Sequence, residues 1–196
     1  MATVGRPRSF DKDEALKKAM YVFWEKGYEG TSMADLIESI GMKAPSLYAA
    51  FGNKDAIFKE VVTHYLPIVT HGQLSILHNT AGIYDAVEKT LNECVRLFTS
   101  KENPHTCLIM TAAINASPEH QEHVESLREL RKEYKRNWIK RFERAGNEGQ
   151  LKAGLTPQQL AEYFVTVIQG MSLSAKDGAK KEDLAKTSEI AIQILK

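Results

Sequence analysis

Residues 31–51 read TSMADLIESIGMKAPSLYAAF, and this stretch predicts two short helices joined by a tight turn. Thr31 and Ser32 provide hydroxyl groups that can cap the first helix, in which apolar residues recur three and four positions apart. Gly41 is suited to end that helix, and Pro45 falls in the first turn of the next one, where proline is tolerated. The short spacing between the two helices is typical of a helix-turn-helix motif.

Longer helices are predicted on both sides of the motif, over 11–26 and from 53 to about 78. Asp11 is placed to cap the first of them. Pro67 lies inside the second and is expected to bend it, because proline cannot donate a backbone hydrogen bond to the preceding turn. Two short helices braced by longer ones complete the layout of a DNA-binding head.

The remainder of the chain also has helical periodicity, and no segment alternates as a strand would. The predicted fold class is all-α: an N-terminal helix-turn-helix domain over residues 1–52, and a C-terminal effector-binding and dimerisation domain over residues 53–196. The further helices are expected at 82–100, 106–116, 119–146, 157–176 and 183–195.

The composition, 43% hydrophobic and 26% charged over 196 residues, is typical of an ordered soluble protein. No apolar stretch has the length of a membrane span or a signal peptide, so we expect a cytoplasmic protein with no membrane partner. The two cysteines, Cys94 and Cys107, are too few for a disulfide framework and lack zinc-site spacing, so no cofactor is expected. A net charge of +1 excludes a protein that coats nucleic acid through its overall charge, and any DNA footprint must be local.

The outward face of the helix over 44–51 carries small, uncharged side chains that allow close approach to base edges. Hydroxyl groups and cations lie around this face and are suited to phosphate contacts, and a short basic arm precedes the first helix. The alternatives are that the hydroxyls only cap a helix, that Lys54 is an ordinary surface lysine and that the arm is solvated. The predicted DNA-binding residues are Arg6, Arg8, Thr31, Ser32, Lys43, Ala44, Pro45, Ser46, Tyr48, Ala49 and Lys54.

Residues 5–66, with GRPRSFD at 5–11, FWEKGYEGTS at 23–32 and APSLYAAFGNK at 44–54, resemble the DNA-binding head of the tetracycline-repressor (TetR) family. The resemblance implies that Lys43 to Ser46 and Ala49 meet the major groove and that Thr31, Tyr48 and Lys54 hold phosphates. More loosely, Thr106-Cys107-Leu108 and residues 170–178, GMSLSAKDG, resemble one branch of the variable ligand domains. The family implies an all-α homodimer, usually a repressor that a small molecule releases from a double-stranded DNA operator.

The last two predicted helices each have an apolar face, which together suffice for a four-helix interface with a twofold-related copy. Such a dimer reads two half-sites, so its operator is expected to be pseudo-palindromic. The alternative is that these faces belong to the core of a single chain. The predicted interface residues are Leu160, Phe164, Val167, Ile168, Met171, Leu184, Ala191, Ile194 and Leu195.

The body offers two candidate means of sensing a signal. Cys107 is expected near a helix N-terminus, where the helix dipole favours the thiolate, and Lys176 would lower its pKa further if adjacent. A thiolate reacts with oxidants and electrophiles, so such a chemical is one candidate signal for release from DNA. The alternative for Cys107 is an inert, buried cysteine. The other candidate is a pocket that binds an unknown organic effector reversibly, and the alternative to that pocket is a filled hydrophobic core. The candidate residues are Tyr65, Ile68, Cys94, Phe98, Cys107, Met110, Ile114 and Lys176.

Other functions find less support in the sequence. His64, His71 and His78 stand about 10 Å apart along one helix, too far for a single ion. His120 and His123 sit on what reads as a solvated helix start, so no metal site is predicted. No catalytic residue is predicted, because Cys107 and His105 diverge on a helix. A helical protein-interaction module without specific DNA binding is the alternative to a regulator.

Overall fold

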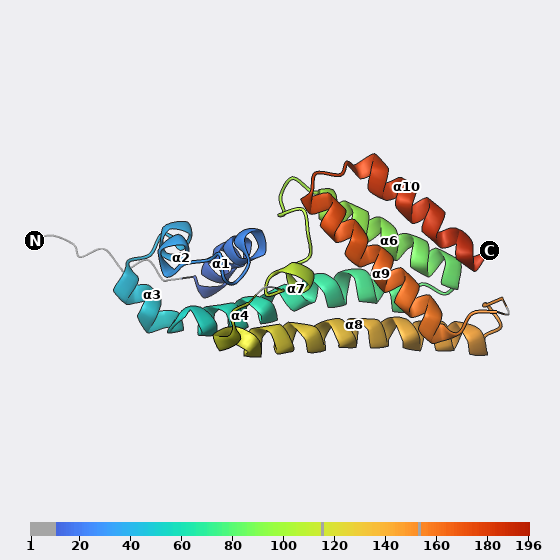
Figure 1. Ribbon diagram of the computed structural model, residues 1–196, viewed down its shortest axis with the longest axis horizontal. Helices are drawn as coiled ribbons and strands as arrows, with labels where there is room; N and C mark the ends of the chain where they lie inside the picture. The colour runs from blue at the N-terminus through green and yellow to red at the C-terminus, as the bar shows by residue number, and fades with distance from the viewer. Residues whose placement is uncertain (1–10, 115, 153) are drawn as a thin grey trace, which may run out of the picture.

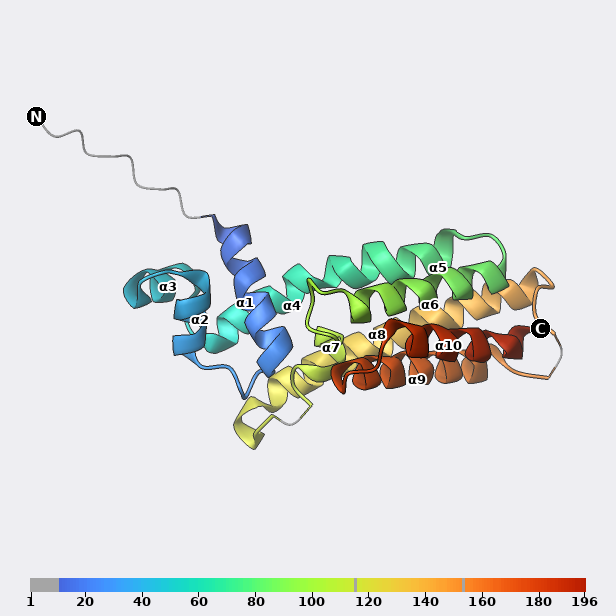
Figure 2. The same ribbon diagram turned by 90° about the horizontal axis from the view of Figure 1, so that it is seen from above.

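The computed structural model describes residues 11–114, 116–152 and 154–196, and all regular structure within these ranges is helical. Figures 1 and 2 show an elongated molecule with α1, α2 and α3 at one end and the C-terminus at the other. The predicted all-α fold, a helix-turn-helix head on a helical body, is confirmed. None of the described helices is both long and apolar enough to cross a membrane.

The head consists of α1 (Lys12–Lys26), α2 (Met33–Ile40) and α3 (Ala44–Phe51). The carboxylate of Asp11 accepts backbone hydrogen bonds from the first turn of α1, as predicted. Gly41 ends α2 with a φ of +78°, in the left-handed region that favours glycine. Leu47 and Phe51, four residues apart on α3, are both buried, which fixes the opposite side of α3 toward solvent.

Helix α4 (Lys54–Pro67) carries the chain from the head into the body (Figure 1). The predicted disturbance at Pro67 takes the form of a π-helical segment over Ile68–Leu74, after which α5 (Ser75–Asn79) is regular again. The amide of Ser75 donates to the carbonyl of Thr70, five residues back. A proline without an N–H group interrupts the α-helical ladder, and the wider turn restores backbone bonding beyond it.

The body is completed by α6 (Ile83–Thr99), α7 (Leu108–Thr111), a 3₁₀ turn (Pro118–His120), α8 (Gln121–Asn147), α9 (Pro157–Lys176), α10 (Lys181–Ala191) and a final 3₁₀ turn (Ile192–Leu195). The aromatic side chains of Trp138 and Phe142 on α8 stack on Phe164 of α9, with ring centroids 5.8 and 5.7 Å apart. This layer forms the centre of the body's core.

The helix predicted over 106–116 is wrong in extent, because α7 contains only four residues. At its start, the Cys107 amide donates to the Ser172 hydroxyl, and the Cys107 backbone is extended. At its end, the carbonyl of Ala112 accepts from the amide of Tyr28 in the head at 2.6 Å. Both ends of α7 are therefore fixed by other parts of the molecule rather than by continuation of the helix.

The predicted dimer face is also corrected by the structure. The side chains of Leu160, Phe164, Ile168, Met171, Leu184 and Ala191 are buried in the core of the chain itself, where α9 packs on α8 and α10 on α6. Val167 and Leu195 are half-buried, and only Ile194 of the predicted set is exposed. The periodic apolar face pointed inward, since a helix in a two-layer body must cover its own core first.

Candidate nucleic-acid interface

Helix α3 presents the face that the sequence predicted. Ser46, Tyr48 and Ala49 are exposed on it, and Tyr48 is 49% accessible although it is a large residue. Pro45 is exposed in the first turn and Ala44 is half-buried. An exposed face of small side chains beside a tyrosine hydroxyl fits close approach to the edges of base pairs.

Lys43 precedes α3 directly, in the N-cap position, and its side chain is exposed. The first backbone amides of a helix are free to bind an anion, and the Lys43 ammonium lies beside them. Together they suit a phosphate group or the acceptor edge of a guanine. Arg6 and Arg8, the predicted basic arm, lie outside the described residues.

The start of α2 is already neutralised by the chain itself. Ser32 caps α2 in a reciprocal capping box with Asp35, whose carboxylate also pairs with Lys26 at 2.7 Å. The Lys26 ammonium, followed by the backbone and hydroxyl of Ser32, lowers the pKa of Asp35 well below its usual range. Ser32 remains exposed, but a phosphate here would meet a carboxylate.

Thr31 does not offer its hydroxyl to DNA, contrary to the prediction. The side chain is 1% exposed, and its hydroxyl donates to the carbonyl of Gly27 at 2.6 Å. It does not cap α2 either, the alternative considered for it, because Ser32 holds that position.

Lys54 is engaged within the head as well. Its ammonium donates to the carbonyls of Tyr28 and Thr31 at 3.2 and 3.1 Å, and it lies 4.2 Å from the centroid of the Tyr28 ring. Two carbonyl acceptors and an aromatic face satisfy the cation internally. Sequence reasoning missed this role because the partners lie more than twenty residues away along the chain.

Tyr28 also joins the head to the body, a role that no sequence pattern indicated. Its hydroxyl donates to the carboxylate of Asp55 at 2.5 Å, and the same oxygen lies 2.8 Å from Nε2 of His123 on α8. Both Tyr28 and His123 are buried. The hydrogen bonds from Tyr28 and then His123 lower the pKa of Asp55, so the junction contains a carboxylate held by two partners.

A second junction lies beside it. The carboxylate of Glu29 accepts from the backbone amide of Ser117 at 2.7 Å and lies 2.9 Å from Nδ1 of His120. These two bonds lower the pKa of Glu29 to about 2. His120 and His123 are thus used in joining the head to the body. The described residues contain no group of three or more His, Cys, Asp or Glu that could hold a metal ion.

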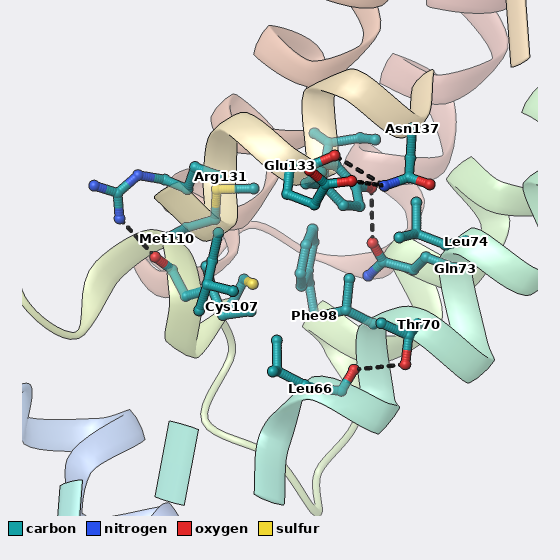
Figure 3. A pocket seen from close by; sticks show the side chains of 15 residues that line it. Leu66, Thr70, Gln73, Leu74, Phe98, Cys107, Met110, Arg131, Glu133 and Asn137 are labelled. Carbon is teal, nitrogen blue, oxygen red and sulfur yellow. Dashed lines mark hydrogen bonds between the residues drawn. The ribbon is translucent and has the colours of Figure 1, made fainter. Parts of the chain in front are cut away.

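The body contains a largely apolar cavity of about 230 Å³, shown in Figure 3. Phe98, Cys107 and Met110, three of the predicted residues, line it. The remaining lining comes from the α4–π–α5 stretch, α7, α8 and α9, namely Leu66, Val69, Thr70, Gln73, Leu74, Ile109, Leu130, Arg131, Glu133, Tyr134, Asn137 and Ile168. Small organic molecules bind in cavities of this character.

The other predicted sensing residues lie elsewhere. Cys94 is buried in the core and Ile68 is half-buried beside it, and neither lines the cavity. Ile114 is exposed beyond the shortened α7, and Lys176 faces two surface hollows that contain Trp24. The prediction for Ile114 assumed a helix over 106–116, which ends early at Thr111. The effect of Lys176 was conditional on its lying beside Cys107, and the charge that acts on this thiol is that of Arg131.

Cys107 is a buried thiol rather than an activated one. Burial raises its pKa, against the smaller lowering effect of the Tyr65 hydroxyl, which lies 3.5 Å from Sγ. The charge that acts on it is that of Arg131, not of Lys176. Nδ1 of His105 lies 3.1 Å from the carbonyl of Phe98, so this histidine is not positioned as a base for the thiol. The predicted lowering of the thiol pKa is therefore wrong.

Comparison with known proteins agrees with this geometry. Residues 15–61 match the family model for bacterial regulatory proteins of the tetR family. ComR, an HTH-type transcriptional repressor of Escherichia coli K12, is 32% identical over 191 residues, which cover 97% of this chain and 91% of ComR. A solved structure of a cysteine mutant of the TetR family transcriptional regulator CifR, complexed with 26-base-pair operator DNA, is 39% identical. Its TM-score is 0.90, and the match covers 96% of this chain and 98% of that one.

A helix-turn-helix head that presents α3 at one end of a helical body defines a DNA-binding transcriptional regulator. The chain belongs to the TetR family of transcriptional regulators. Its relatives are regulators of this family and not enzymes.

Proposed function

We propose that the chain is a repressor that binds a pseudo-palindromic operator as a homodimer and leaves it when a small molecule enters the cavity of the body. Direct base contacts are assigned to Lys43, Ala44, Pro45, Ser46 and Ala49, and a phosphate contact to Tyr48. The exposed, small-residue face of α3 carries the DNA-binding part of this assignment. ComR is named as a repressor, and CifR was solved with operator DNA, which supports the same role here.

The short helix α7 links the cavity to the head, which supports release by a ligand. Cys107, Ile109 and Met110 line the cavity from this segment. On either side of it, the carbonyl of Thr106 accepts from Nε1 of Trp24 at 2.9 Å and that of Ala112 from the amide of Tyr28. A molecule that displaces α7 therefore changes two hydrogen bonds of the head, one from Trp24 on α1 and one from Tyr28. A change in these bonds biases the orientation of α3.

Within the family, we assign the chain to the branch whose ligand domain carries a Cys-Leu and an Ala-Lys-Asp-Gly segment, and one contact supports this assignment. The two segments meet, because the hydroxyl of Ser172 lies 2.9 Å from that of Thr106 and accepts from the amide of Cys107 at 3.0 Å. Contact between the two stretches that carry the resemblance supports a common design of this ligand domain.

The proposed boundary between the two domains, at residues 52 and 53, falls just before α4. Helix α4 contacts both the head and the body.

Dimerisation is assigned to the outward side of α9 and α10. Tyr163, Leu173, Ile190 and Ile194 are large apolar side chains left exposed there, and Leu173 and Ile190 are 57% and 64% accessible. Exposed apolar side chains concentrated on one pair of helices are typical of a protein–protein interface. Gly170 lies between Tyr163 and Leu173 with no atom near its missing side chain, which permits close approach of a partner helix.

The test is a gel-shift assay with the DNA upstream of the chain's own gene and with genomic fragments. We expect a sequence-specific, salt-sensitive complex that small apolar molecules dissociate. The absence of any specific complex would favour the alternative, a helical protein-interaction module.

A Cys107→Ser variant distinguishes the two candidate signals, an oxidant that reacts with the thiol and an apolar molecule that enters the cavity. If it no longer responds to hypochlorite but still responds to apolar molecules, the thiol facing the cavity is a second sensor.

A further inference from the structure

The side chain of Gln73 lines the cavity and has a hydrogen-bond donor without a partner. The residue is 3% exposed, and its side-chain oxygen accepts a hydrogen bond from the hydroxyl of Tyr134 at 2.8 Å. Its Nε2 has no hydrogen-bond acceptor among the described residues. Figure 3 shows this nitrogen turned toward Phe98, with the sulfur of Cys107 on the far side of the ring. A buried amide donor without a partner costs free energy unless a ligand or water supplies an acceptor.

The backbone around Gln73 is built for this placement. Val69, Thr70, Gln73 and Leu74 all line the cavity and all belong to the π-helical segment that follows Pro67. The wider turn rotates these side chains relative to a regular α-helix, and such turns recur at functional sites. The hydrogen bond from Tyr134, which is itself buried, then fixes which end of the amide faces the cavity.

The charged groups that line the cavity, Arg131 and Glu133, are hydrogen-bonded within the chain, which limits the ligand. Arg131 donates to the carbonyl of Ile109 at 2.7 Å, and Glu133 accepts hydrogen bonds from Arg136 and Asn137. The remaining wall is mostly hydrocarbon. An anion beside Gln73 would lose its hydration without an opposite charge next to it, because the guanidinium of Arg131 turns away from Gln73 in Figure 3. A cation would find the Glu133 carboxylate already paired with Arg136.

We propose that Gln73 selects the effector: a small, neutral, mainly hydrocarbon molecule with one hydrogen-bond acceptor, such as a carbonyl or ether oxygen, which Nε2 binds. This inference rests on the proposed effector cavity. Tyr134 is a positioning residue, because its hydroxyl holds the amide in the donor orientation.

The test compares two probes of equal shape, cyclohexanone and methylenecyclohexane, by calorimetric titration of the full chain. Because the hydrocarbon enters any apolar cavity more readily, the informative quantity is the ratio of the two affinities, compared between variants. Gln73→Met keeps the volume and removes the donor. We expect it to lower the ketone-to-hydrocarbon affinity ratio about tenfold relative to the unmodified chain.

Thr70→Val is the matched control, since the Thr70 hydroxyl already donates to the carbonyl of Leu66 at 3.1 Å. It should leave the ratio unchanged, whereas Tyr134→Phe should give an intermediate ratio. In ¹H–¹⁵N spectra, the side-chain amide signal that is lost in Gln73→Met should move with cyclohexanone and not with methylenecyclohexane.

Two results would overturn the proposal, and they differ in meaning. Equal ratios in the unmodified chain and in Gln73→Met would reject the donor role of Gln73 while leaving the cavity as an effector site. Failure of both probes to bind the folded, unmodified chain would reject the cavity itself and with it the proposed mode of release.

Discussion

Two lysines of the head that look equivalent in the sequence have different environments. Lys43 is exposed before α3, whereas the ammonium of Lys54 is bonded to two carbonyls and rests on the Tyr28 ring. We expect Lys54→Met to lower the free energy of unfolding by about 1–2 kcal/mol, because charged hydrogen bonds in a partly buried place are lost.

Lys43→Met should leave stability unchanged and lower operator affinity, with a changed preference at the base pair that Lys43 contacts, as binding to operators altered at single base pairs would show. Thermal melts and salt-dependent binding of both variants check this contrast. Full stability of Lys54→Met together with a reduced salt slope would show that Lys54 reaches a phosphate after all.

Glu29 links the head to residues 117 and 120, and its bonds predict a pH dependence. Its pKa is lowered to about 2 from an ordinary value of 4.5, first by the Ser117 amide and then by His120. A lowered carboxyl pKa stabilises the folded state above the unfolded value, and this contribution disappears as the pH falls through about 2. Glu29→Gln should therefore be less stable than the unmodified chain at pH 7, with the difference in urea midpoint shrinking from pH 5 downward. A difference that is the same at pH 7 and pH 3 would contradict this assignment.

At the level of residues, the sequence predicted what depends on neighbours along the chain. The cap at Asp11 and the outward face of α3 follow from local spacing, and both are found. The bond from Thr31 to the carbonyl of Gly27 is local, four residues back, and was overlooked. Lys54 was assigned to a phosphate because its partners, the carbonyl and the ring of Tyr28, depend on how the head folds. Gln73 was missed for the same reason, since its single hydrogen bond comes from a helix sixty-one residues later.

Among the elements, α8 stabilises the end of α5 through a buried arginine. The guanidinium of Arg141 donates to the carbonyls of Leu77, Thr80 and Ala81 at 3.0, 3.2 and 2.9 Å, and burial lowers its pKa. These carbonyls lie where the helix stops and have no helical donors.

Arg141→Met should lower the free energy of unfolding by about 3 kcal/mol, because three carbonyl acceptors, that of Leu77 buried and the other two partly buried, lose a charged donor. The exposed neighbour Lys140, replaced by Met, serves as the control and should change stability by less than about 0.5 kcal/mol. Urea unfolding measures both, and equal stabilities for the two variants would contradict the role of Arg141.

The long helices were predicted to within a few residues because their periodicity is sustained over several turns, as in α6, α8 and α9. The short helix α7 was not, since its ends are set by Ser172 and by Tyr28 rather than by its own sequence. Pro67 predicted where the helical ladder changes, but the choice between a kink and a π-helical segment depends on what surrounds the helix.

At the scale of the whole molecule, the head and the helices α9 and α10 lie on different parts of an elongated chain (Figure 2). One copy presents a single α3, so a two-half-site operator requires a second copy in fixed orientation. Most side chains of the predicted interface are buried in the single chain, since the buried side of an amphipathic helix carries the stronger pattern. Residues left over after the core is filled, such as Leu173 and Ile190, become visible only once the fold is known.

Leu173→Asp should therefore convert a dimer into a monomer while the chain stays folded, because the residue is exposed in the single chain and would place a charge in the apolar centre of the interface. Sedimentation should show the lower mass, and circular dichroism an unchanged helical content. Operator affinity should fall by at least a hundredfold, since each half-site is then bound independently. Leu155→Asp is the matched control: Leu155 is also exposed, but it precedes α9 and lies outside the proposed face. A Leu173→Asp chain that still sediments as a dimer would move the interface away from α9 and α10, and the two-half-site geometry would need another pair of surfaces.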